Sequence, residues 1–255
     1  MPKESLSYWR TGGLWGVLRK ELRSSFSSLI AYIVIVVFLV LTGLLLWVFP
    51  QTNILDYGYA NIDPLFQLAP YIYLVLIPAI TMRAFAEERR SGTLEMLLTK
   101  PLSDWHVILG KYLASLTLVV FALLPTLLYY YTVYELGSPR GNVDTAAVIG
   151  SYIGLLLLGA IFTAIGLLAS SLTENQIVAF MLSIFLSYFI YDGFASLAAV
   201  NLWADNAYLL LQLGVDYHYA SISKGLVDSR NLIYFFSTIF LLLQLTKLSL
   251  SSRKW

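Results

Sequence analysis

Long apolar stretches that contain no charged residue recur along the whole chain. A helix rises about 1.5 Å per residue, so roughly 20 apolar residues are needed to cross the ~30 Å hydrocarbon core of a bilayer. Six stretches approach or exceed this length, and the last two are the shortest. They predict an all-α polytopic membrane protein with transmembrane helices at residues 29–49, 65–83, 111–134, 146–169, 175–193 and 231–248.

The composition supports lipid as the surrounding solvent. Of 255 residues, 58% are hydrophobic and 12% are charged, whereas an ordinary soluble domain has roughly 25% charged residues. The chain has no cysteine, which excludes disulfides and thiolate chemistry. The apolar stretch that begins near Leu29 is too long for the core of a signal peptide, and no small-residue cleavage site follows it. We therefore expect no cleaved leader.

The distribution of Lys and Arg predicts the orientation. With the N-terminus inside, only Arg140, Lys224 and Arg230 of the 16 Lys and Arg residues fall on the outer side. Cytoplasmic loops of membrane proteins carry such an excess of cations. We therefore expect a multi-pass protein of the bacterial inner membrane with both termini in the cytoplasm.

Two segments outside the spans have an amphipathic pattern. Residues 14–26 place five apolar side chains within about 120° of arc, which predicts an interfacial helix. That helix either anchors the chain at the membrane surface or also contacts a cytoplasmic partner. Residues 194–228 are too polar to span and too apolar for a free loop, and their aromatic residues favour an outer re-entrant hairpin. The five apolar residues of the first segment are Leu14, Trp15, Leu18, Leu22 and Phe26.

The loop between the second and third spans, residues 84–103, carries the most specific pattern. Ser91-Gly92 interrupts the chain, Thr93 is suited to cap a short helix, and Pro101 ends it. Three leucines of this helix share one face at helical spacing. Leucines that face water need a partner surface, although the helix could instead pack on its own bundle or among lipid headgroups.

Motifs for chemistry are absent from the sequence. There is no phosphate-binding loop and no zinc-protease or serine-hydrolase signature. His106 and His218 are predicted at opposite faces of the membrane, so we expect no metal site, no cofactor and no enzymatic activity of the chain itself. Asp192 is interpreted as the end of a span rather than a proton relay. Gly150 and Gly154 indicate close helix packing, either within the subunit or between subunits.

Residues 85–103 and 110–112 carry a resemblance to a known family. They read Phe85-Ala-Glu-Glu-Arg-Arg-Ser-Gly-Thr-Leu-Glu-Met-Leu-Leu-Thr-Lys-Pro-Leu-Ser and Gly110-Lys-Tyr. This segment resembles the cytoplasmic loop of type-2 ABC exporter permeases, and the residues before the sixth span are similar to that family at the matching place. The resemblance covers nearly the whole chain as a single permease domain, residues 1–255. Permeases of gliding-motility transporters are the most similar subgroup, and those of nitrous-oxide-reductase maturation are built similarly.

The resemblance implies half of a transporter that works with separate partners. These are a cytoplasmic ABC ATPase, a second permease copy or related chain, and the lipid bilayer; nucleic acid is not expected. The loop would form a coupling helix seated in a groove of the ATPase. An ion-coupled transporter and a membrane assembly factor without an ATPase are the alternatives. The expected interface residues are Glu87, Glu88, Arg89, Thr93, Leu94, Leu97, Leu98 and Pro101.

Overall fold

The computed structural model describes residues 3–93, 103–200 and 207–252, and every regular element in these residues is a helix. Within the described residues, six helical segments are long and apolar enough to cross a membrane, and they coincide with the six predicted spans. The all-α polytopic prediction is therefore confirmed. The six segments are Leu29–Trp47, Asp63–Arg90, Asp104–Leu136, Thr145–Leu172, Gln176–Ala198 and Ser229–Ser251.

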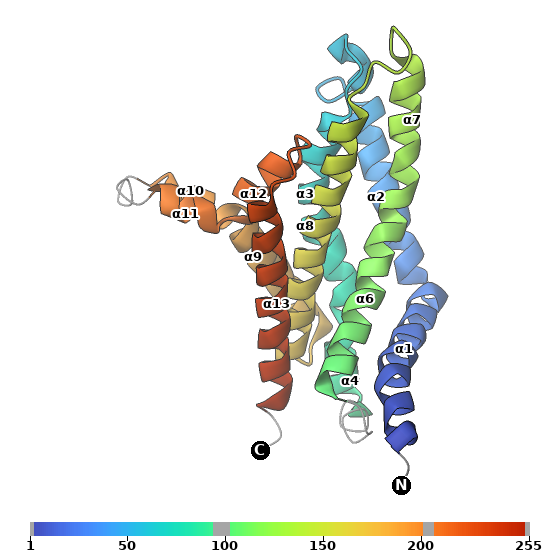
Figure 1. Cartoon of the computed structure of the whole chain (residues 1–255), viewed down its shortest axis with the longest axis vertical. Helices are drawn as coiled ribbons and strands as arrows, with labels where there is room; N and C mark the ends of the chain where they lie inside the picture. The colour runs from blue at the N-terminus through green and yellow to red at the C-terminus, as the bar shows by residue number, and fades with distance from the viewer. Residues whose placement is uncertain (1–2, 94–102, 201–206, 253–255) are drawn as a thin grey trace.

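Several spans are built from more than one element because the helix changes type or direction inside them (Figure 1). The second span breaks at Met82, the third passes through a 3₁₀ turn that contains Pro125, and the fifth contains a π-helical turn. The elements are α1 (Lys3–Ser27), α2 (Leu29–Trp47), η1 (Ile54–Tyr57), α3 (Asp63–Thr81), α4 (Arg83–Arg90), α6 (Asp104–Leu123), η2 (Leu124–Thr126), α7 (Leu127–Leu136), α8 (Thr145–Leu172), α9 (Gln176–Tyr188), η3 (Phe189–Gly193), α10 (Phe194–Ala198), α11 (Ala207–Leu213), α12 (Val215–Ile222) and α13 (Ser229–Ser251).

Helix α8 is the centre of the bundle, and α3, α6, α9 and α13 pack against it (Figure 1). Two of its glycines allow α12 and the loop after it to approach closely as well. A Cβ atom at Gly150 would lie 2.8 Å from the Cα of Gly225, and one at Gly154 would lie 2.8 Å from Cγ2 of Ile222. Both contacts are within the chain, which confirms the packing interpretation of this glycine pair.

Helix α1 contains the predicted interfacial segment 14–26 but is longer, and it packs lengthwise beside α6 (Figure 1). The contact depends on Gly110, because a Cβ atom there would lie 2.7 Å from Cγ1 of Val17. Trp15 remains 63% exposed. The helix is thus part of the bundle, and its place at the membrane surface stays a prediction.

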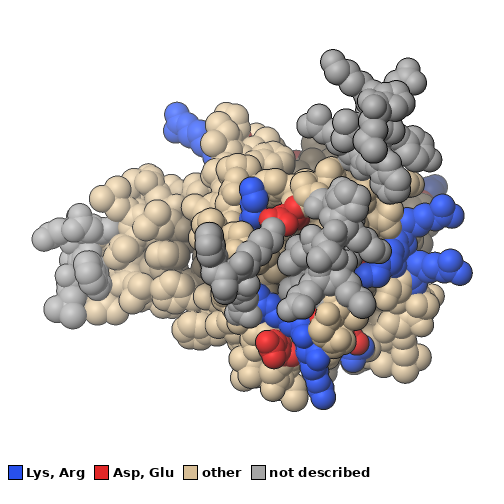
Figure 2. Space-filling model, turned by 90° about the horizontal axis from the view of Figure 1, so that it is seen from below, with Lys and Arg blue, Asp and Glu red and all other residues tan. Residues whose placement is uncertain are grey.

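The two termini lie at the same end of the bundle, as an even number of spans requires (Figure 1). Many Lys and Arg side chains gather on that end (Figure 2). Farther from the end with the termini, α10 and α11 pack on each other and project sideways from the bundle (Figure 1). Helix α12 then packs against α8 and α13. The short link between α10 and α11 lies outside the described residues. The re-entrant position of this segment stays a prediction.

Candidate functional site

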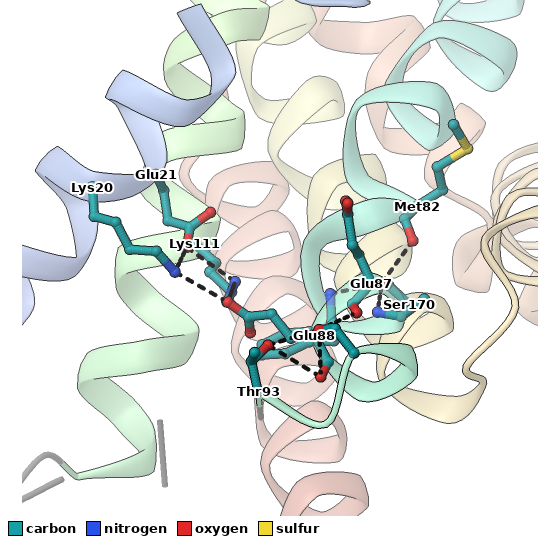
Figure 3. Close-up of polar contacts among 11 residues, drawn as sticks. Lys20, Glu21, Met82, Glu87, Glu88, Thr93, Lys111 and Ser170 are labelled. Carbon is teal, nitrogen blue, oxygen red and sulfur yellow. Dashed lines mark hydrogen bonds and ion pairs between the residues drawn. The ribbon is translucent and has the colours of Figure 1, made fainter. Parts of the chain in front are cut away.

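Four charged side chains from three helices meet at the end of the bundle that holds both termini (Figure 3). The ammonium of Lys111 on α6 lies 2.9 Å from Oε1 of Glu88 on α4 and 3.1 Å from Oε1 of Glu21 on α1. The ammonium of Lys20 lies 3.2 Å from each of the same two oxygens. Two cations and two carboxylates therefore form a neutral cluster, called the ionic cluster below, that joins α1, α4 and α6.

The ionic cluster is buried at one side and open at the other. The side chain of Lys111 is only 2% exposed, those of Glu88 and Glu21 are 15% and 18% exposed, and that of Lys20 is 57% exposed. The ring of Phe85, itself fully buried, lies 5.3 Å from the Lys111 ammonium. Lys111 contacts a carboxylate of α1 and one of α4, so the inner half of the ionic cluster holds the three helices together.

The charges of the ionic cluster shift the titration of its α1 members. Burial alone would raise the pKa of Glu21, but the Lys111 and Lys20 ammonium groups outweigh it and hold that pKa below its ordinary value. Burial alone would lower the pKa of Lys20, but the Glu21 and Glu88 carboxylates raise it. Both shifts favour the charged forms of Glu21 and Lys20.

Helix α4 is also fixed at its beginning by a buried serine of α8. The Ser170 hydroxyl accepts hydrogen bonds from the backbone N–H groups of Phe85 and Ala86, at 2.9 and 3.0 Å, and donates to the Met82 carbonyl at 3.0 Å. The first N–H groups of a helix have no partner within it, so an outside acceptor is needed when they are buried. Ser170 supplies that acceptor from the central helix.

The end of α4 is closed by a turn at Gly92, whose φ of 67° suits glycine. The Ser91 hydroxyl donates to the Glu87 carbonyl at 2.9 Å, and the Thr93 hydroxyl donates to the Glu88 carbonyl at 3.3 Å. Thr93 therefore binds the end of α4. Its expected capping of the next helix concerns neighbours outside the described residues.

The predicted site residues take different positions. Glu88 faces inward to the ionic cluster, where the buried Lys111 needs a carboxylate. Glu87 is exposed, and Arg89 is partly buried beside it. The other expected interface residues lie outside the described part of the chain: Leu94, Leu97, Leu98 and Pro101.

Sequence reasoning missed Lys20, Glu21, Lys111 and Ser170 as members of the site. In the sequence alone, Lys20 and Lys111 are only two of the cations that indicate the topology. Glu21 and Lys111 are 90 residues apart in sequence, and Phe85 and Ser170 are 85 apart. One signal was present, because a lysine that follows Gly110 and precedes an apolar span needs a counter-ion when the adjacent helix packs closely.

Other candidate groups are used locally. His106 forms a capping box with Ser103 at the start of α6, and His218 bonds to the Asn231 side chain and the Gln212 carbonyl. Asp192 accepts hydrogen bonds from hydroxyls one turn away on each side. Within residues 3–93, 103–200 and 207–252, no group of three or more potential ligands could hold a metal ion.

Comparison with known proteins gives two findings. A model of the ABC-2 family of transporter proteins matches residues 15–249. The probable multidrug ABC transporter permease YbhR of Escherichia coli K12 is 26% identical over 127 residues, which cover 50% of this chain and 32% of that protein. The same protein of Escherichia coli O157:H7 gives the same values. The matched stretch thus spans about a third of the length of these relatives.

Proposed function

The chain belongs to the ABC-2 family of transporter proteins, and from this premise we propose that it is the membrane subunit of an ATP-driven exporter of the bacterial inner membrane. A separate ABC ATPase supplies the energy, and a second copy or a related chain completes the pathway. Both termini lie in the cytoplasm, on the side of the ATPase. The positive charge of the end that carries the termini supports this orientation (Figure 2).

The way α4 is anchored is the observation that carries this proposal. This eight-residue helix leads directly into the loop expected to contact the ATPase. Ser170 ties its beginning to α8, and Glu88 ties its last turn to α6 and α1 through Lys111 and Lys20. A displacement of the loop would therefore move α8, α6 and α1 together with α4, because α4 is bonded to all three.

The coupling interface follows from this arrangement. We assign the apolar contact with the ATPase to Leu94, Leu97 and Leu98 and the polar contact to Arg89, because Glu87 lines a cavity between α1, α4 and α6. Glu88 positions the loop from the inside instead of contacting the ATPase. A role in gliding motility stays a prediction from the resemblance.

Substitution of Leu97 by Asp tests the proposal. A carboxylate placed in an apolar groove without a partner costs several kcal/mol, so recovery of the ATPase should fall by about a hundredfold or more. The measurement is the amount of ABC ATPase subunit that co-purifies with the tagged chain at matched membrane levels. Leu136→Asp, at the exposed end of α7 far from the loop, is the control.

Equal recovery of the ATPase with Leu97→Asp and wild type would reject the docking role. Reduced membrane abundance of this variant, with unchanged recovery per chain, would mean that the leucines pack on the protein's own bundle.

A second measurement is ATP hydrolysis by the purified chain without partners, which should not exceed a mock preparation. Turnover that persists after contaminating ATPases are removed would contradict the separate-subunit proposal.

A further inference from the structure

A cavity of about 340 Å³ lies above the ionic cluster, between α1, the junction of α3 and α4, and α6. Each of its three walls changes from charged residues at one end to aliphatic residues at the other, through small residues that are alanine or serine. On α1 and α2 it passes from Lys20 and Glu21 to Ile30, and on α6 from Lys111 to Leu118. The cavity is therefore amphipathic along the direction of the spans.

This gradient matches the depth at which the spans meet the membrane surface. The apolar walls belong to the first turn of α2 and the last turns of α3, and the charged walls belong to α1 and α4 just beyond them. Phospholipids have the same order of polarity at that depth, with a charged headgroup next to acyl chains. The walls suit a headgroup and the beginning of its chains.

Two charges of the cavity remain available. Among the described residues, the ion pairs of this region involve only Lys20, Glu21, Glu88 and Lys111. Arg83 and Glu87 also line the cavity, both are exposed, and neither forms an ion pair with a described residue. They lie one turn apart on α4, so the site presents one cation and one anion that are not paired with described residues. The Glu87 side chain is shown in Figure 3.

The charge of the whole cavity identifies the kind of headgroup. The described residues that line it contribute three cations and three carboxylates, which cancel, so an anionic lipid finds no net attraction to them. A zwitterion meets a partner at both ends. None of the described residues that line the cavity is Phe, Tyr or Trp, whereas quaternary ammonium groups are usually held by aromatic faces. A primary ammonium instead finds a carboxylate and serine hydroxyls as acceptors.

We propose that this cavity binds the headgroup of a zwitterionic phospholipid that carries a phosphate and a primary amine. Arg83 binds the phosphate, Glu87 binds the ammonium, and the aliphatic wall contacts the glycerol end of the acyl chains. A lipid held there fills the space between α1 and α4 beside the ionic cluster. The site depends on the membrane-spanning fold and not on the ATPase.

The test measures lipid occupancy of the purified chain by native mass spectrometry after equilibration in mixed phosphatidylethanolamine, phosphatidylglycerol and phosphatidylcholine. Wild type should retain phosphatidylethanolamine in preference to both others. Glu87→Gln makes the site net positive, so the ratio of phosphatidylethanolamine to phosphatidylglycerol should fall by about tenfold. Arg83→Gln should lose phosphatidylethanolamine without gaining phosphatidylglycerol.

Matched controls separate this site from general surface charge. Arg90→Gln on the same helix and Glu174→Gln after α8 remove exposed charges that do not line the cavity, and both should keep the wild-type ratio. Each variant is compared at an unchanged size-exclusion profile. If Arg83→Gln does not fold, the exposed Glu87→Gln variant carries the test alone.

Several outcomes would overturn the proposal. They are a wild-type preference for phosphatidylglycerol, an unchanged lipid ratio in Glu87→Gln, or an equal shift in the Arg90 control. Glycerophosphoethanolamine, the soluble headgroup, should not displace the lipid at equal concentration, because it lacks the apolar part. Full displacement would assign the site to a soluble phosphoamine instead. No ATPase is present, so failure here leaves the transporter proposal untouched, and failure of ATPase recovery leaves this one untouched.

Discussion

Replacement of Lys111 by Met tests how the three helices at the charged end are held together. Methionine keeps much of the length and apolar volume of the lysine but removes the ammonium that both carboxylates share. Since Lys111 is 2% exposed and its partners are 15% and 18% exposed, Glu21 and Glu88 would be left as partly buried carboxylates with only Lys20.

The structure sets the expected magnitude. Removal of one partner of a buried ion pair costs about 3–5 kcal/mol. The value here should lie near the lower end, about 3 kcal/mol, because Lys20 still contacts both carboxylates and part of the ionic cluster faces solvent. For a chain of this size that loss corresponds to a midpoint about 6–12 °C lower. Lys20→Met removes the 57% exposed cation from the same carboxylates and should cost about 1 kcal/mol or less.

The assay is thermal unfolding of the purified chain in one detergent, followed by its size-exclusion profile after heating. The double variant Lys111→Met with Glu88→Gln removes one charge of each sign. It should be more stable than the sum of the single changes predicts, by about 1 kcal/mol or more. The reasoning is refuted if Lys111→Met unfolds within about 0.5 kcal/mol of wild type, or if Lys20→Met is equally destabilising.

Two further predictions concern the same end of the bundle. Ser170→Ala leaves two buried N–H groups of α4 without an acceptor and should lower stability by about 2 kcal/mol. Ser171→Ala removes only a hydrogen bond to Leu168 within α8 and should cost less. Thermal unfolding of the two variants compares the two losses. The pKa of Glu21 in the folded chain lies below its ordinary value of 4.5, so its contribution to the free energy of unfolding should be complete above that pH and lost as the pH falls through the lower value. Unfolding measured from pH 7 downward should show a drop in stability that Glu21→Gln reduces. An unchanged pH profile in this variant would contradict the assignment.

The amino-acid sequence determined the class and the spans of this protein. Whether a stretch such as 146–169 enters lipid depends on its own length and apolarity, which are local properties readable without any partner. The excess of Lys and Arg on one side of the spans and the motif around Phe85 can likewise be identified from the sequence without knowledge of any partner. The break at Met82 within the second span was not predicted. A proline inside a helix allows the helix to bend but does not determine the residue at which the bend occurs.

Only the tertiary structure decided which side chains meet. Gly110 and Val17 had no visible relation in the sequence, yet their contact places α1 against α6 and so brings Glu21 to Lys111. The packing of α1 on α6 also leaves Lys111 paired with Glu88 of α4, a contact that the charge of Glu88 alone did not indicate.

The physical reason is that the pairing of charges depends on the arrangement of helices in space. Lys20 and Glu88 are 68 residues apart, and nothing in the local pattern of either segment distinguishes a buried partner from a solvated surface charge. Apolarity decides where a helix lies in the membrane, whereas rotation and contact between helices are decided by the fit of small residues such as Gly110 and Gly154.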